Sequence, residues 1–131
     1  MKQQVYRDDG AIGALLDEYE NSVRALKTVI QSISDSDLIK IVDTKTTDKD
    51  CVSIQSILDH VIRAGYNYVI AIRKWKGEDL SYRVSESQTS VADYKLRLDE
   101  MFCFNEQLFS DYPTIQLEQK GEHEKIHVSW G

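Results

Sequence analysis

The chain has 131 residues, 41% of them hydrophobic and 29% charged, and its 16 basic and 22 acidic side chains give a formal charge of −6. This length suits one domain, residues 1–131, that buries a core without a disulfide or a metal ion. The acidic balance argues against a nucleic-acid-binding protein, because such proteins concentrate Lys and Arg on one face. We expect no signal peptide, because the first residues contain no apolar core of signal-peptide length. We also expect no membrane-spanning helix, since no apolar run approaches the required length of about 18 residues.

The two cysteines, Cys51 and Cys103, lie far apart and outside any CxxC pattern. This spacing predicts reduced thiols and a cytoplasmic protein. Neither cysteine has a histidine within a few residues, so the sequence gives little support to a nucleophilic thiol. Two groups of acidic residues are expected to form a solvated face. They are Asp17, Glu18 and Glu20 within residues 11–34, and Asp99 and Glu100 within residues 90–112.

Residues 11–34 form the first predicted helix. Apolar side chains recur at alternating intervals of four and three residues, which is the pattern of a helix that packs on its neighbours at a shallow angle. They are Ile12, Leu16, Tyr19, Val23, Leu26, Ile30 and Ile33. Asp8 and Asp9 precede the run and suit a helix N-terminus, where free amides favour carboxylates.

Residues 53–76 form the second predicted helix, after a connection in which residues 39–42 favour a short strand. Ser53 is the expected N-cap, and Gly77 supplies the left-handed residue that ends the helix. The alternating spacing is the same as in the first helix. Its positions are Ile54, Leu58, Val61, Gly65, Tyr68, Ile72 and Trp75.

Residues 90–112 form the third predicted helix, with Ser90 as N-cap, Asp93 completing a partial capping box, and Pro113 as the stop. The stripe of this helix that is expected to face its neighbours has the same alternating spacing. It consists of Val91, Tyr94, Leu98, Met101, Asn105, Leu108 and Tyr112. Asn105 has two open interpretations. It either fixes the register of the helices, as a buried Asn does in coiled coils, or belongs to a polar pocket.

The C-terminal residues favour an extended arm, because Ile126, Val128 and Trp130 alternate strictly with polar residues. Three long helices with broad apolar faces, followed by this arm, predict an all-α helical bundle of the four-helix type that lacks its last helix. We therefore expect the domain to be incomplete at its C-terminus.

His60 lies on the flank of the apolar stripe of the second predicted helix. Two interpretations follow. It is either a half-buried histidine bonded to a neighbouring side chain, or a catalytic or metal-binding group. One histidine alone does not make a metal site.

The segment from His123 to His127 matches the HExxH motif of zinc peptidases, in which Glu124 would be the general base. The alternation around it predicts an extended backbone, which separates the two imidazoles by roughly 13 Å. We therefore predict that His123 and His127 do not share a metal ion. A zincin-like peptidase would require a helix over residues 122–128.

Residues 53–66 resemble the His-bearing second helix of the DinB/YfiT-like family of metalloenzymes. An apolar pair and a polar residue precede His60, and a small residue and the aromatic Tyr66 follow it. The resemblance extends to the helix lengths, the long first connection, the Ser-Val-x-x-Tyr start of the third helix and the tail at residues 125–131.

This resemblance implies a four-helix bundle in which three histidines bind one divalent metal ion, such as zinc, nickel or iron. One histidine comes from the second helix, where His60 matches it, and two come from the fourth. The fourth helix has no counterpart in this chain, and His123 and His127 precede the place where it would begin. The resemblance therefore implies that metal binding by this chain is weak or absent.

Two functions from different classes follow. The resemblance implies a metal-dependent hydrolase, or a transferase that uses a small thiol such as bacillithiol or mycothiol. The alternative is a non-catalytic helical interaction module. An uncovered apolar groove predicts a homodimer, and the side chains expected nearest to that groove are Tyr68, Ile72, Met101 and Leu108.

Overall fold

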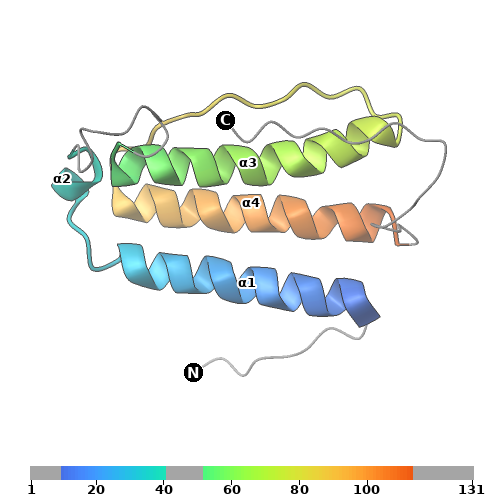
Figure 1. Cartoon of the computed structure of the whole chain (residues 1–131), viewed down its shortest axis with the longest axis horizontal. Helices are drawn as coiled ribbons and strands as arrows, with labels where there is room; N and C mark the ends of the chain where they lie inside the picture. The colour runs from blue at the N-terminus through green and yellow to red at the C-terminus, as the bar shows by residue number, and fades with distance from the viewer. Residues whose placement is uncertain (1–9, 41–51, 114–131) are drawn as a thin grey trace.

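The computed structural model describes residues 10–40 and 52–113, and all regular elements in these ranges are helices (Figure 1). They are α1 (Gly10–Ile30), α2 (Asp35–Leu38), α3 (Ile54–Trp75) and α4 (Val91–Asp111). Helix α4 lies between α1 and α3 and packs against both. The predicted all-α helical architecture is therefore confirmed for the described residues. None of the described helices combines the length and apolar character needed to cross a membrane.

Helix α1 ends at Ile30, four residues before the predicted end. Ser34 supplies the reason, because its side chain accepts a hydrogen bond from the backbone amide of Asp37 and caps the short helix α2. The predicted strand at residues 39–42 is wrong at its first residue. Ile39 has helical backbone angles and forms the C-cap of α2.

The predicted starts of α3 and α4 are confirmed. The Ser53 side chain accepts a hydrogen bond from the backbone amide of Ser56. The Ser56 side chain in turn accepts one from the backbone amide of Ser53, which completes a capping box. Ser90 accepts in the same way from the amide of Asp93. Gly77 follows α3 with a φ of 102°, as the predicted left-handed residue at a helix end requires.

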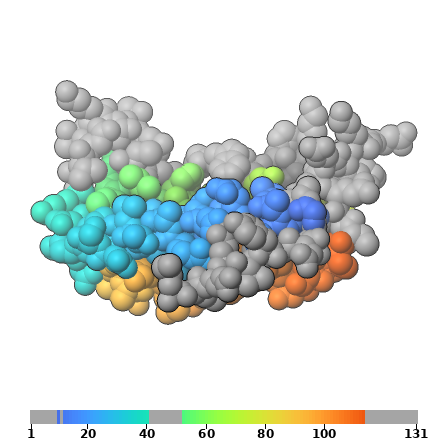
Figure 2. All heavy atoms as spheres, turned by 90° about the horizontal axis from the view of Figure 1, so that it is seen from below, coloured from blue at the N-terminus to red at the C-terminus, as the bar shows by residue number. Residues whose placement is uncertain are grey.

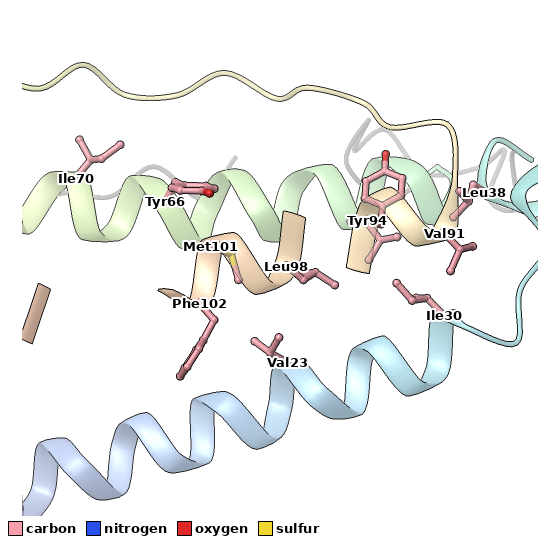
Figure 3. Close-up of a cluster of buried hydrophobic side chains, with 11 residues drawn as sticks. Val23, Ile30, Leu38, Tyr66, Ile70, Val91, Tyr94, Leu98, Met101 and Phe102 are labelled. Carbon is pink, nitrogen blue, oxygen red and sulfur yellow. The ribbon is translucent and has the colours of Figure 1, made fainter. Parts of the chain in front are cut away.

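The hydrophobic core lies along α4, where it meets α1 and α3 (Figure 3). Val23 of α1 points toward α4, and Phe102 of α4 points back toward α1. Tyr94, Leu98 and Met101 of α4 are at most 1% exposed. The spacing that predicted the apolar faces of α1 and α4 therefore also identified Val23, Tyr94, Leu98 and Met101 as core residues, but not Phe102.

The buried face of α3 includes Leu58 and Ile72 of the predicted stripe but extends to one side of that stripe. Tyr68 was expected in the buried stripe, yet it is 46% exposed, while Tyr66 and Ile70 are buried. Gly65 of the predicted stripe meets Met101 of α4, whereas Tyr66 lies beside the chain that follows α3, with the Arg83 guanidinium 3.8 Å from its ring centroid. Tyr68 lies on the other side of the stripe, where it lines a groove together with residues of α1. Because α4 lies between α1 and α3 and packs against both, this side of α3 stays partly open.

An extended strap, residues 78–90, connects α3 to α4 and runs back along α3 (Figure 1). Side chains of α3 bond to its backbone and hold it in place. The amide of Asn67 donates to the carbonyl of Arg83 and accepts from its N–H, and Gln55 donates to the carbonyl of Gln88. The strap therefore covers a side of α3 with polar contacts.

Helix α1 runs across one face of the molecule, between α2 at one end and the C-terminal end of α4 at the other (Figure 2). Lys27 of α1 forms an ion pair with Asp99 of α4 at 2.5 Å, which joins the two helices at the surface. The predicted solvated acidic face is wrong at one position. Asp17 is only 7% exposed, so the buried stripe of α1 extends to this residue.

Candidate functional site

A groove of about 460 Å³ lies between α1 and α3, and α4 contributes its third wall. Seven residues of α3 between His60 and Ile72 line it, together with three from α1 and three from α4. Most of the lining side chains are aliphatic or aromatic. Its volume and composition are typical of binding sites in proteins.

The open side of the groove carries large apolar side chains. Leu15 of α1 is 52% exposed and Tyr68 of α3 is 46% exposed. The prediction that Tyr68, Ile72 and Leu108 lie at an apolar groove is confirmed. For Met101 it is wrong, because this side chain points into the core and is 1% exposed.

His60 lines the groove, as we expected from its place on the flank of the helix. Its Nδ1 lies 2.9 Å from Nη2 of Arg63, one turn further along α3. Nη1 of the same guanidinium donates to Oγ of Ser85 in the strap, at 3.1 Å. The interpretation of His60 as a partly buried histidine bonded to a neighbour is therefore confirmed.

The contacts of Asn105 support the register role that its sequence position left open. Its Nδ2 donates to the carbonyl of Gly65 at 3.2 Å, which ties α4 to α3 and supports the register role. The same nitrogen donates to the carbonyl of Met101 at 2.9 Å. Asn105 also lines the groove, so it places an amide among apolar side chains.

Gly65 lets α3 and α4 approach closely beside the groove. A Cβ atom at this position would lie 2.1 Å from Sδ of Met101 and 2.8 Å from its Cγ. Because Met101 is fully buried, it has little space in which to move away. The absence of a side chain at Gly65 therefore permits the close approach of the two helices; its backbone is helical.

The described residues do not fit a metal centre. They contain no group of three or more His, Cys, Asp and Glu side chains that could hold a metal ion. His60 is the only predicted ligand among them, and its Nδ1 already accepts a hydrogen bond. His123 and His127 lie outside the described residues, so the prediction that they do not share a metal stays a prediction.

We did not predict from the sequence a buried polar cluster on the other side of α3. Asp59 is 8% exposed, and its carboxylate accepts from the hydroxyls of Tyr94 at 2.6 Å and Ser87 at 2.5 Å. Burial and this hydrogen bond to Asp59 raise the pKa of the Tyr94 hydroxyl. The available signal was an aspartate placed directly after Leu58 in the apolar stripe.

A second cavity, of about 510 Å³, lies beside this cluster under the strap. Its basic groups are Arg63, Arg83 and Arg97, and its acidic groups are Asp59, Glu86 and Glu100. Arg97 pairs with Glu100 at 2.6 Å. The three basic and three acidic groups give the lining a formal charge of zero.

Arg73 joins the C-terminal ends of α3 and α4. Its side chain is 8% exposed and donates to Glu78 at 2.9 Å and to Asp111 at 2.7 Å. The Tyr112 hydroxyl donates to the same Glu78 oxygen at 2.5 Å. Tyr112 and Arg73 together lower the pKa of Glu78, and Arg73 and then Gln107 lower that of Asp111.

These lowered pKa values predict an acid-sensitive contribution to stability. A carboxyl group with a lowered folded-state pKa stabilises the fold above its unfolded pKa of about 4, and this contribution is lost as the pH falls through the folded-state value. We expect the free energy of unfolding to fall below about pH 4, and to fall less steeply in Arg73→Met. Urea unfolding at pH 6 and pH 3 measures the difference. Equal pH dependence in the two proteins would contradict the assignment.

No protein-family model matches the chain, and no curated protein or solved structure matches it either. The resemblance to the DinB/YfiT-like family therefore depends on the residues of the chain alone.

Proposed function

We propose that this chain is a helical interaction module that acts through the groove between α1 and α3, and that the groove is covered by a second copy of the chain. The single observation that carries the proposal is the apolar lining of this groove, of about 460 Å³, with contributions from three helices. A large apolar side chain removed from water stabilises a complex by roughly 1.5–3 kcal/mol. Exposed apolar grooves of this kind usually mark interfaces.

A second copy suits the groove because every chain carries both the groove and exposed apolar side chains at its edge, which can enter the groove of the partner. Leu15 and Tyr68 stand on opposite walls and are half exposed. A two-fold pairing lets the same side chains of one protomer meet the groove of the other. Such symmetric dimers are the commonest closed assemblies.

Light scattering at micromolar concentration tests the dimer. We expect a mass of about twice the 15.1 kDa of one chain, and a single-chain mass for Tyr68→Lys and for Leu15→Lys, because a charge cannot enter an apolar interface unpaired. Val84→Lys is the matched control, since Val84 is 79% exposed on the strap and does not line the groove. A wild-type monomer, or a control that dissociates like the groove variants, would contradict the proposal.

A second candidate is a cytoplasmic, metal-dependent hydrolase or thiol-dependent transferase of the DinB/YfiT-like, four-helix type, acting on a small molecule. One observation favours it. His60, the residue that matches a family ligand, lines the apolar groove. An exposed, free Cys103 suits a reducing compartment. In this function His60 would bind zinc, nickel or iron together with two histidines from another helix.

Calorimetric titration with zinc tests the second candidate on the 131-residue chain. We expect no tight site, because affinity comes from several ligands held together and His60 is a single one. A submicromolar one-to-one titration that is lost in His60→Gln would favour the enzyme over the interaction module.

A further inference from the structure

Arg63 makes the hydrogen bond that determines which nitrogen of His60 carries a proton. Its Nη2 lies 2.9 Å from Nδ1 of His60. A guanidinium has five N–H donors and no acceptor, and it stays protonated in proteins. Nδ1 must therefore use its lone pair as the acceptor in this contact. In the neutral imidazole the single proton is then on Nε2.

We propose that Arg63 fixes His60 as the Nε2–H tautomer, so that the imidazole acts as a hydrogen-bond donor toward an oxygen acceptor and not as a ligand for a divalent metal. Metal binding through Nε2 would require the proton to move to Nδ1. Two N–H groups, one on Nδ1 and one on Arg63, would then face each other. Metal binding through Nδ1 would require Arg63 to leave.

The polarity of this contact is the reverse of the one found around metal-binding histidines. A ligating histidine usually donates its second N–H to a carboxylate or a backbone carbonyl, which raises the basicity of the ligating nitrogen. Here the second nitrogen accepts from a cation. The neighbouring carboxylate, that of Asp59, accepts from Tyr94 and Ser87 instead.

The strap holds Arg63 in the position that this role requires. Nη1 of Arg63 donates to Oγ of Ser85 at 3.1 Å while Nη2 reaches His60. Two bonds from one planar group restrict its rotation, so Ser85 acts as a positioning residue for Arg63. The group that accepts from Nε2 must carry an oxygen lone pair, as a carbonyl or a carboxylate does. This inference does not depend on which molecule covers the groove.

Nitrogen-15 NMR of the imidazoles in the full chain tests the tautomer directly, with the His60 signals assigned by their loss in His60→Gln. At a pH where the ring is neutral, we expect Nε2 to be protonated and Nδ1 unprotonated. Arg63→Met should lower the ratio of the two tautomers about tenfold or more, because a hydrogen bond from a charged donor is lost. Arg63→Lys, which keeps a cationic donor, should retain part of the preference.

Arg24→Met is the matched control, because Arg24 is exposed on α1 and pairs with Glu20; it should leave the His60 signals unchanged. One equivalent of zinc should not shift the His60 signals of the wild-type chain. A protonated Nδ1 in the wild-type chain, or zinc bound at His60 while Arg63 is present, would overturn the inference. Loss of the dimer in light scattering would leave these NMR results unaffected, so the two proposals fail separately.

Discussion

Replacing Tyr94 with Phe is expected to lower the free energy of unfolding by about 1.5–3 kcal/mol, the range for hydrogen bonds to charged groups. The Tyr94 side chain is completely buried. Its hydroxyl donates to Asp59 and accepts from the amide of Gln88, so one substitution removes both bonds. The carboxylate of Asp59 would remain buried with one hydrogen-bond donor fewer, and burying a charge without enough hydrogen bonds costs free energy. Urea unfolding at pH 7 measures the loss.

Tyr82→Phe is the matched control, because it removes the same hydroxyl from a side chain that is 48% exposed. Surface substitutions of this kind change stability by less than about 0.5 kcal/mol. A double-mutant cycle with Asp59→Asn separates the Tyr94–Asp59 pair from other effects, since residues in contact show non-additive losses. A Tyr94→Phe protein as stable as the control would show that the buried cluster contributes nothing.

Gly65→Ala is expected to lower the free energy of unfolding by about 1–3 kcal/mol, the usual cost of overpacking a filled core. The added methyl group would lie 2.1 Å from Sδ of Met101, which must then move within a buried site. Helix propensity works in the opposite direction, because alanine in a helix is more stable than glycine by roughly 0.5–1 kcal/mol. The sign of the measured change therefore decides between packing and propensity.

Met101→Ala provides the partner for a double-mutant cycle. Alone it should cost about 2–5 kcal/mol, because it leaves a cavity in the core. In its presence Gly65→Ala should become neutral or stabilising, since the clash is gone and the new methyl group fills part of the space. Thermal unfolding of the four proteins measures the coupling. Additive losses would mean that the close approach of α3 and α4 does not depend on this pair.

His60 shows how far a pattern of spacings could predict the candidate site. Its distance from the apolar stripe predicted that it would line a concave region, and it lines the groove. The spacing could not show that Arg63 would bond to its Nδ1, because that contact depends on rotamers and on Ser85, which lies 22 residues further along the chain than Arg63. The metal-ligand role of His60 stays a prediction. The position of Arg63 argues against it, because Nδ1 of His60 accepts a hydrogen bond where a metal-binding histidine would donate one.

The sequence alone determined where α3 and α4 begin and which faces of α1 and α4 are apolar. Those features depend on hydrogen bonds and side chains within one or two helical turns, such as the bond from the Ser56 amide to Ser53. Only the tertiary structure decided that Tyr66 and Met101 are buried in the core, and that Asp59 meets Tyr94, 35 residues away. These outcomes depend on α4 lying between α1 and α3, an arrangement that a helical repeat along one segment does not specify.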